Sequence, residues 1–303
     1  MKWDLHRPLT HPGAQPLTAR LVRGLLGEVH IERRRRVVFV CGGAIKPGTT
    51  NDRTVFLDWA KTHLDNDVLC LLSEDAYRAN TIRATKFINL GEFEKTLASV
   101  SDCVLIFPES AGSYSELGIF ATVNQIKYKT LIANRSSHQI HDSFLLQGPL
   151  HAINVSSLFT PGVIYDTASS AAPPFSEQIW TRIKETPHYQ SRKRLSTEPF
   201  VYMPQLDQIA IISWVLGITG IVTFADLLQI IRIAYKEQKN DARILKYTLR
   251  LMLLLGQLTI PSKEVYRTIP KPDFNLSVEG TISKLRAQFR EFWITEFPGL
   301  WGY

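Results

Sequence analysis

Residues 103–118 read CVLIFPESAGSYSELG, and this stretch decides the fold of the first half of the chain. The unbroken apolar run Cys103–Phe107 predicts a buried β-strand, and the Gly- and Ser-rich turn after it leads into a helix predicted over residues 114–125. In open α/β sheets, ligands bind outside the carboxyl ends of the strands, where helix N-termini offer unpaired N–H groups. Two carboxylates, Glu109 and Glu116, flank this turn. The stretch therefore predicts a ligand site.

The sequence on either side repeats this alternation of strand and helix. The further predicted strands are Val37–Cys41, Val68–Leu72 and the shorter candidates Thr130–Ala133 and Ala152–Val155, and the predicted helices between them are Val55–Leu64 and Glu92–Val100. Apolar strands without apolar–polar alternation, separated by helices, indicate a parallel sheet that is covered on both faces. We therefore predict an α/β parallel-sheet domain over residues 37–185.

The rest of the chain has a different pattern. Residues 1–36 read as a tail with one short helix, and residues 186–203 are rich in Ser, Pro and basic residues, which is typical of a linker. Residues 204–303 are mainly helical in pattern. The predicted elements there are helices at Leu206–Leu216, Thr223–Glu237 and Ala242–Leu255, a hairpin of Leu258–Ile260 with Val265–Ile269, and a last helix at Thr281–Glu296. Three helices followed by a hairpin is the order of a winged helix-turn-helix domain.

The composition excludes several classes of protein. With 45% hydrophobic residues, the 303-residue chain is able to bury a core and does not resemble a disordered protein. The three cysteines lack C-x-x-C spacing, which argues against a disulfide framework or a zinc site, and the histidines follow no metal-ligand spacing. We expect no metal and no cofactor. Because residues 1–19 show no signal peptide, we expect a cytoplasmic protein.

One segment needs a comparison with membrane helices. Residues 208–225 carry no formal charge and are about long enough to span a bilayer. However, Gly217 and Gly220 interrupt the segment, and Thr223 with Asp226 has the spacing of a helix N-cap. Two amphipathic helices joined by a turn therefore fit the segment better than a transmembrane helix, and we expect no membrane partner.

The net charge of +7 and the pI near 9.3 favour polyanionic partners. The densest basic run, residues 33–36, is either a solvated strand entrance or a phosphate contact for nucleic acid. A second basic series lies on the predicted C-terminal helices and is a candidate for the same contact, although such a series is usually a solvated face. Its members are Arg232, Lys236, Lys239, Arg243, Lys246 and Arg250.

The two carboxylates of the opening turn indicate acid–base or nucleophilic chemistry. Glu116 falls within the predicted first helical turn, where the helix dipole favours the ionised form. An ionised carboxylate beside a sugar acts as a nucleophile or stabilises an oxocarbenium-like transition state. Glu109, paired with it, is expected to hold a proton more tightly, which suits a general acid. The Ser110 and Ser113 hydroxyls and the small Gly112 complete the turn. Alternatively, the acidic residues only cap the helix.

Two other strand ends are expected to converge on this turn. Cys41, Gly42 and Gly43 end the first strand, but they form neither a G-x-G-x-x-G fingerprint nor a P-loop. Glu74 and Asp75 follow the second strand, where they either bind ribose hydroxyls or cap the next segment.

Taken together, the CGG after the first strand, the SED after the second and the F-P-E-S-x-G-S-x-x-E-L-G-x-F element resemble one family. This family is the nucleoside 2-deoxyribosyltransferase-like effectors encoded beside retron reverse transcriptases. The resemblance covers residues 37–269, and it implies a flavodoxin/deoxyribosyltransferase-like α/β domain followed by a winged-helix DNA-binding domain.

The resemblance also implies roles by position. Glu116 matches the catalytic glutamate that acts at the anomeric carbon, and Glu109, with Ser110, Gly112 and Ser113, matches the loop that lines the pocket. Cys41, Gly42, Gly43, Glu74 and Asp75 match the turns under the nucleotide. Where Ser113 stands, nucleoside deoxyribosyltransferases have an aspartate three residues before the nucleophile. This departure puts base transfer in doubt and fits hydrolysis.

The resemblance further implies an antiphage toxin that the reverse transcriptase and its msDNA or its precursor RNA hold in check, with assembly into the retron complex. The expected reaction is cleavage of the N-glycosidic bond of a nucleotide or NAD. A rival hypothesis keeps the fold without the reaction, as a nucleotide-sensing DNA-binding regulator. Base exchange between deoxynucleosides is a third possibility, and it requires a free acceptor base.

Overall fold

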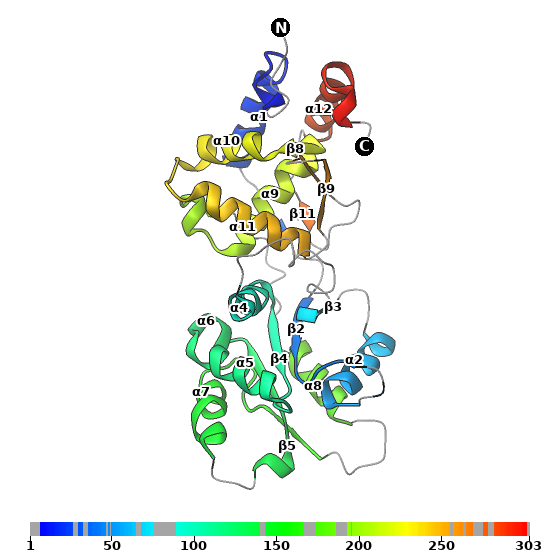
Figure 1. The fold of residues 1–303 in the computed structure, drawn as a ribbon, viewed down its shortest axis with the longest axis vertical. Helices are drawn as coiled ribbons and strands as arrows, with labels where there is room; N and C mark the ends of the chain where they lie inside the picture. The colour runs from blue at the N-terminus through cyan, green and yellow to red at the C-terminus, as the bar shows by residue number, and fades with distance from the viewer. Residues whose placement is uncertain are drawn as a thin grey trace. The chain divides into compact units, whose positions relative to one another are not determined.

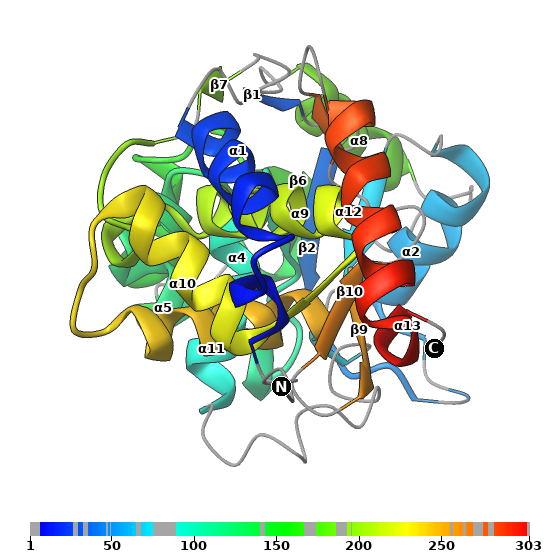
Figure 2. The same cartoon turned by 90° about the horizontal axis from the view of Figure 1, so that it is seen from above.

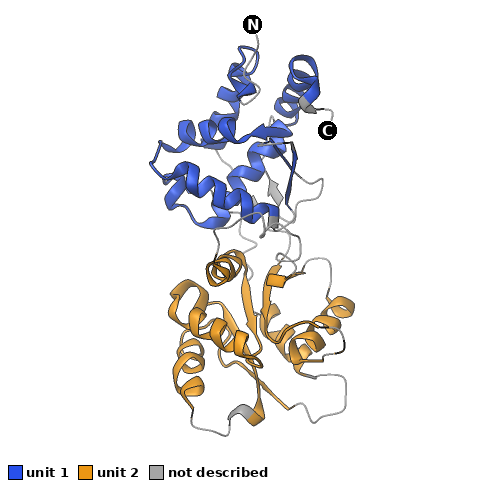
Figure 3. Cartoon of the chain, viewed as in Figure 1, with its two compact units in different colours: residues 1–34, 190–303 blue, residues 35–189 orange. Residues whose placement is uncertain are grey.

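The computed structural model describes residues 7–26, 30–32, 36–46, 48, 50–64, 68–74, 89–139, 143–166, 174–185, 193–194, 196–254, 257–262, 265–268, 275–277 and 282–301. The chain divides into two compact units (Figure 3). Residues 35–189 form one, which we call the α/β unit, and residues 1–34 with 190–303 form the other, which we call the helical unit. The N-terminal segment therefore shares a unit with the C-terminal part of the chain, whereas the sequence pattern set it apart as a tail.

A five-stranded parallel sheet forms the centre of the α/β unit (Figure 1). Its order is β3-β2-β4-β5-β6, and every neighbouring pair is parallel, as the sequence predicted. The strands are β2 (Arg36–Cys41), β3 (Val68–Leu71), β4 (Cys103–Ile106), β5 (Thr130–Arg135) and β6 (Val163–Tyr165). In β2 and β4, Cys41 pairs with Ile106, so the two strands end at the same level in the sheet.

Helices cover both faces of this sheet (Figures 1 and 2). The helical segments are α2 (Asp52–His63), α4 (Leu90–Val100), α5 (Ala111–Thr122), α6 (Asn124–Lys127), the π-helical turn η3 (Leu146–Leu150), α7 (His151–Asn154) and α8 (Pro174–Glu185). On one face, Val38 and Leu105 join a buried cluster with side chains of α2 and α8. On the other face, Phe39 packs against Phe120 of α5 with ring centroids 6.3 Å apart. Burial on both faces explains the uninterrupted apolar strands.

The expected strand at residues 152–155 is wrong. Residues 151–154 form α7, which continues directly from η3, and Leu150 and Ile153 are buried at helical spacing. The fifth strand is instead β6, in which Val163 and Tyr165 are buried while Ile164 between them is exposed. A three-residue strand with this alternation is too short to stand out in the sequence.

The helical unit contains α1 (Gln15–Leu26), α9 (Gln205–Thr219), α10 (Phe224–Tyr235), α11 (Asp241–Leu254), α12 (Ile282–Glu296) and α13 (Pro298–Trp301). Strands β8 (Ile221–Thr223), β9 (Leu258–Ser262) and β10 (Val265–Thr268) form an antiparallel sheet of order β8-β10-β9. The predicted hairpin is therefore confirmed as β9 and β10. A second sheet joins β11 (Asn275–Ser277), β1 (His30–Glu32) and β7 (Lys193–Arg194).

The uncharged segment at residues 208–225 forms most of α9, the short strand β8 and the start of α10. Helix α9 is buried on nearly all sides rather than amphipathic as predicted, and it continues through Gly217. It ends at Gly220, whose φ of 76° suits a residue without a Cβ. The Thr223 hydroxyl accepts the Asp226 N–H and caps α10, as predicted. None of the helices in the described ranges is both long and apolar enough to cross a membrane.

Candidate active site

The turn after β4 holds itself together through two serines. Ser110 is the N-cap of α5, and its hydroxyl accepts the Ser113 N–H at 3.1 Å. In return, the Ser113 hydroxyl accepts the N–H groups of Glu109 at 3.0 Å and Ser110 at 2.9 Å. Ser113 is fully buried. The structure thus gives Ser113 a part in the capping box of α5, rather than an exposed position from which it would meet a ligand.

Glu109 ties this turn to the neighbouring strand end. One carboxylate oxygen accepts the Gly43 N–H at 2.8 Å and the Arg53 N–H at 3.3 Å, and the other accepts the Asp52 N–H at 2.8 Å. Asp52 and Arg53 begin α2, so the carboxylate occupies the electropositive end of that helix. With three N–H donors directed at it, Glu109 acts as an acceptor that fixes two loops. This arrangement does not suit the general-acid role that the sequence suggested.

The two glycines after β2 make room for these contacts. A Cβ atom on Gly42 would lie 2.8 Å from Cβ of Arg53 and 2.9 Å from Glu109 Oε1, and one on Gly43 would lie 2.8 Å from Asn51 Nδ2. Side chains at these positions would therefore displace Glu109 or the start of α2. Gly112, by contrast, is exposed in the first turn of α5.

Glu116 lies in the second turn of α5, because the helix begins at Ala111. Its side chain is half-buried, and its Oε2 atom is buried without a hydrogen-bond partner among the described residues. The pKa of Glu116 is raised to about 8, mainly by burial and secondly by the negative charge of Glu94. The predicted ionised state is therefore wrong: the helix dipole fades beyond the first turn, and burial outweighs it. The isolated protein holds Glu116 mainly protonated at neutral pH.

Three further groups surround Glu116. The Cys41 thiol is buried at the end of β2 and hydrogen-bonds to Glu116, while burial raises its own pKa well above the ordinary value. Glu94 of α4 is also buried and hydrogen-bonds to Glu116, and burial raises its pKa as well. Arg53 is only 2% exposed, and its positive charge lowers the pKa of Glu116 in part. The site is thus a cluster of acidic groups around one buried cation.

Glu74, at the end of β3, is the partner of Arg53. Its carboxylate forms an ion pair with the guanidinium, with Arg53 Nη1 3.4 Å from Glu74 Oε2. Burial alone would raise the pKa of Glu74, but the hydrogen bond and charge of Arg53 lower it below its ordinary value. Glu74 is therefore an ionised carboxylate beside the protonated Glu116. Asp75, the other predicted residue of this turn, lies outside the described residues.

A second ion pair, between the buried Asp52 and the half-buried Arg135, fixes the start of α2. Asp52 accepts hydrogen bonds from Arg135 Nη2 at 2.8 Å and from the Tyr165 hydroxyl at 2.7 Å. Arg135 ends β5 and Tyr165 ends β6, so this contact joins α2 to the two strands. Within the described part of the chain, no group of three or more His, Cys, Asp or Glu side chains has the arrangement of a metal site.

The structure therefore brings together Cys41, Gly42, Gly43, Glu74, Glu109, Ser110 and Glu116 at the carboxyl edge of the sheet. Sequence reasoning missed Arg53, Glu94 and the Asp52–Arg135 pair. Glu94 had one visible signal, since it lies between the buried positions Phe93 and Leu97 on a predicted amphipathic helix. An acidic residue on such a face is seldom buried without a purpose.

The basic residues predicted for nucleic-acid contact lie in the helical unit on and between α10 and α11. Lys236, Lys239, Arg243 and Lys246 are exposed, and Lys246 lies 5.2 Å from the ring centre of Phe224. Arg232 is half-buried and forms an ion pair with Glu237 at 3.1 Å, which partly neutralises it. Arg250 is half-buried. Of the basic run at residues 33–36, only Arg36 is described, and it is half-buried in β2.

The chain thus combines a parallel-sheet α/β unit, with an acidic cluster at the carboxyl edge of its strands, and a helical unit with a small antiparallel sheet. A family model described as STM3845 retron effector protein matches residues 49–260, so the chain belongs to this retron effector family. A relative from Escherichia coli, named as a ribosyltransferase/DNA-binding protein of retron Ec73, is 28% identical over 124 residues. That match covers 41% of this chain and 39% of the relative.

Proposed function

We propose that this retron defence effector is a toxin whose α/β unit hydrolyses the N-glycosidic bond of a nucleotide or NAD. The observation that carries the proposal is the half-buried Glu116 carboxyl at the carboxyl edge of a parallel sheet, with a pKa raised to about 8 and one oxygen that has no hydrogen-bond partner in the described part of the chain. Perturbed carboxyl groups in such places are typical of catalytic sites. The ribosyltransferase part of the relative's name supports the same class of chemistry.

Glu116 is suited to meet positive charge at C1′ of the bound sugar. As the C1′–N bond breaks, its electron pair leaves with the base and the sugar gains oxocarbenium character. This positive charge favours loss of the Glu116 proton, and the resulting carboxylate either stabilises the cation or attacks it. The Glu116 proton passes to solvent, and water then adds to C1′, displacing the carboxylate where it has attacked; the proton that this water loses restores the Glu116 carboxyl. The products are the base, which leaves neutral from NAD and takes a proton from solvent when it leaves as an anion, and the remaining sugar-phosphate part of the substrate.

The contacts of Glu109 favour NAD within this proposal. A neutral base needs a proton as it leaves, but the three N–H groups on Glu109 make it a poor donor. The nicotinamide ring of NAD is already positively charged at the glycosidic nitrogen, so it leaves without a proton. Glu109 then holds the loops in place, and the reaction needs no cofactor because the nucleotide is the substrate.

The test is expression of the Glu116→Gln variant in cells without the reverse transcriptase, with growth and the NAD and nucleotide pools measured. We expect the wild type to stop growth and deplete one pool, and the variant to do neither. The matched control is Glu92→Gln, an exposed residue two positions before Glu94 that is expected to behave as the wild type. Equal toxicity of Glu116→Gln, or intact pools with the wild type, would refute hydrolysis. Product formation only with added acceptor base would indicate base exchange instead.

We propose further that the helical unit is a winged-helix domain that contacts the retron's nucleic acid or the reverse transcriptase. This proposal is supported by the order α9-β8-α10-α11-β9-β10, with β8 paired to β10, which agrees with the helices and hairpin expected of a winged helix, and by the relative's name, which includes DNA binding. The exposed Lys236, Lys239, Arg243 and Lys246 are candidates for phosphate contact. Under the rival hypothesis, in which the protein is a regulator that senses a nucleotide without cleaving it, the same contacts remain and Glu116→Gln has no effect on the pools.

A further inference from the structure

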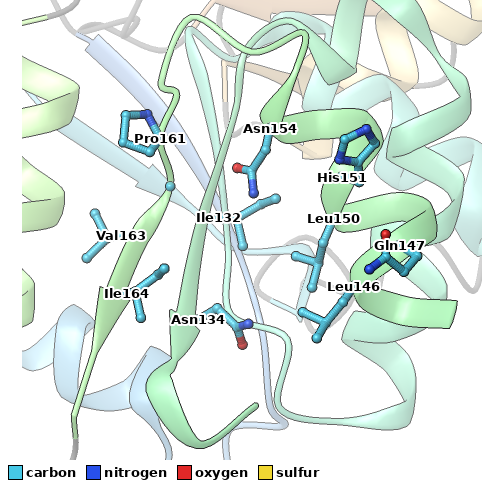
Figure 4. Close-up of a pocket in the computed structure, with 11 residues that line it drawn as sticks. Ile132, Asn134, Leu146, Gln147, Leu150, His151, Asn154, Pro161, Val163 and Ile164 are labelled. Atoms are coloured by element: carbon cyan, nitrogen blue, oxygen red, sulfur yellow. The ribbon is translucent and has the colours of Figure 1, made fainter. Parts of the chain in front are cut away.

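A cavity of about 340 Å³ lies in the α/β unit between the β5–β6 edge of the sheet and the helical segment η3–α7 (Figure 4). Its apolar walls include Ile132, Val163, Leu146 and Leu150. Helix α5 packs against α4, which carries Glu94, and also against η3, which lines this cavity. Helix α5 therefore contacts both the helix that carries Glu94 and a segment that lines the cavity.

One polar side chain that lines this cavity makes no side-chain hydrogen bonds with the described residues. Asn134 of β5 lines the cavity and is only 2% exposed, and both its Nδ2 and Oδ1 atoms are buried without a hydrogen-bond partner among the described residues. In Figure 4 the Asn134 side chain lies beside that of Leu146 and below that of Leu150. A buried amide that makes none of its hydrogen bonds is costly, and native proteins seldom keep one without a partner. A bound ligand would supply both missing partners.

At the other end of the cavity, the main chain at Gly162 packs closely against β5 and Asn154. A Cβ atom at Gly162 would lie 2.8 Å from the main-chain oxygen of Ile132 and 3.3 Å from Asn154 Oδ1. The absence of a side chain there keeps the chain close to β5 while Asn154 faces the cavity. The Asn154 main-chain oxygen in turn accepts the Thr160 hydroxyl at 2.6 Å, which holds this loop.

The lining also restricts the charge of a ligand. Among the eleven lining residues that the structure describes there is no Asp, Glu, Lys or Arg, and His151 is the one titratable side chain. Phosphates and carboxylates are commonly recognised by Arg and Lys side chains, which are absent from the described lining. The volume falls at the small end of the range of about 300–1,000 Å³ that is usual for ligand pockets.

We propose that this cavity is a second ligand site, which binds an uncharged planar ring through an edge that offers a hydrogen-bond donor next to an acceptor. The amide of Asn134 complements such an edge with two hydrogen bonds, as asparagine does with the N6–N7 edge of adenine. Ile132, Leu146 and Leu150 enclose the ring. The edge of a nucleobase and a carboxamide on an aromatic ring share this chemistry.

Binding is measured on the full-length Glu116→Gln chain, so that no probe is consumed. The probes are adenine, uracil and nicotinamide in ligand-detected NMR titrations. Comparing them shows whether the site prefers the edge of a nucleobase or the carboxamide of an aromatic ring. 9-Methylpurine, which has no N–H donor, and nicotinate, which has a charged carboxylate in place of the amide, are the negative probes. We expect at least one of the first three to bind at least about tenfold more tightly than both negative probes, because each missing hydrogen bond leaves Asn134 unpaired.

Two variants test whether the probes bind in this cavity. Asn134→Leu removes the amide and Leu146→Trp fills the cavity, and each is expected to weaken binding at least about tenfold. Leu158→Trp, at an exposed leucine outside the lining, is the matched control and is expected to bind as the parent does. Asn134→Leu is also expected to keep or raise the melting temperature, since it removes two unpaired buried polar atoms. The proposal is overturned if no probe binds, if binding survives either cavity variant, or if Asn134→Leu is destabilised.

Discussion

Glu116 of α5 and Glu94 of α4 bring two carboxyl groups into hydrogen-bonding contact, in which the charge of Glu94 raises the pKa of Glu116 while the hydrogen bond from Glu116 lowers the pKa of Glu94 against the effect of its burial. Groups coupled in this way lose their protons as a pair rather than independently. The pair therefore keeps a proton near neutral pH, until a positively charged ligand or transition state displaces it. This contact between α4 and α5 contributes to the raised pKa of Glu116, which the position of Glu116 in the sequence does not suggest.

The first prediction concerns this contact. Replacing Glu94 with Gln removes the charge that raises the pKa of Glu116, so that pKa is expected to fall below 8. If the carboxylate is the active form, the acid limb of the pH–rate profile moves to lower pH by about one unit. The rate of NAD or nucleotide cleavage against pH measures this shift. Glu92→Gln, on the exposed side of α4, is expected to leave the profile in place, and a shift toward higher pH in Glu94→Gln would contradict the mechanism.

The second prediction concerns stability against pH. Because the pKa of Glu116 is raised from 4.5 to about 8 by folding, the folded chain holds a proton that the unfolded chain releases. The stabilisation is therefore complete below pH 4.5 and is lost as the pH rises to 8. After allowance for the partial exposure of Glu116, we expect this part of the free energy of unfolding to fall by on the order of 2 kcal/mol over that range. Urea unfolding at pH 5, 6, 7 and 8 measures the change.

Glu116→Gln provides the comparison for that experiment. An amide does not ionise, so the difference in stability between the variant and the wild type is expected to move in favour of the variant as the pH rises from 5 to 8. A difference that stays constant across this range would show that the pKa of Glu116 is not raised in the folded protein.

Much of the α/β unit could be predicted from sequence because its central strands are buried on both faces. In β2 and β4, helices pack against both faces of the sheet, so the residues that point to either face are apolar and form an uninterrupted run. Strand β6 was missed because its three apolar residues, Val163–Tyr165, are too short a run to distinguish a strand from a loop. Helix α7 was mistaken for a strand because four residues cannot separate the two periodicities.

The candidate site was predictable only where it follows a strand in the chain. Glu74, Glu109 and Glu116 each follow a strand end, and the parallel sheet brings those ends together. Glu94 reaches the site through the packing of α4 beside α5, which is a tertiary contact that local pattern does not encode. The sequence also does not show that Glu109 fixes the loops while Glu116 is the candidate catalytic residue. This difference arises because the start of α2 directs its N–H groups at Glu109, which is a tertiary contact.

The third prediction separates structure from chemistry at Ser113. Ser113→Ala removes the hydroxyl that accepts the N–H groups of Glu109 and Ser110, whereas the Ser110 hydroxyl still accepts the main-chain N–H at position 113. We expect a loss of about 1–2 kcal/mol in the free energy of unfolding, because two N–H groups lose their acceptor, with cleavage activity retained in the folded fraction. Urea unfolding together with activity per folded molecule measures both. Loss of activity in a stably folded Ser113→Ala chain would give the hydroxyl a direct role with the substrate.

The fourth prediction concerns the buried Asp52. Asp52→Asn removes the negative charge that pairs with Arg135 and accepts from Tyr165, and we expect it to lower the free energy of unfolding by about 2–3 kcal/mol. Asp58→Asn on the same helix is the control: its ion pair with Lys61 is exposed, so a change below about 0.5 kcal/mol is expected. Equal effects of the two substitutions would mean that the start of α2 is not held by Asp52.

The fifth prediction tests the basic surface of the helical unit. Lys239 and Arg243 are exposed, whereas Arg232 is engaged by Glu237. Replacing Lys239 and Arg243 with Ala is expected to weaken binding to single- or double-stranded DNA and to reduce the slope of log affinity against log salt by about 1–2, because each phosphate contact releases counterions. Lys95→Ala together with Lys61→Ala, on the α/β unit, removes the same charge elsewhere. If both double variants lose affinity equally, net charge rather than the α10–α11 surface explains the binding; loss confined to Lys239 and Arg243 places the contact on the helical unit.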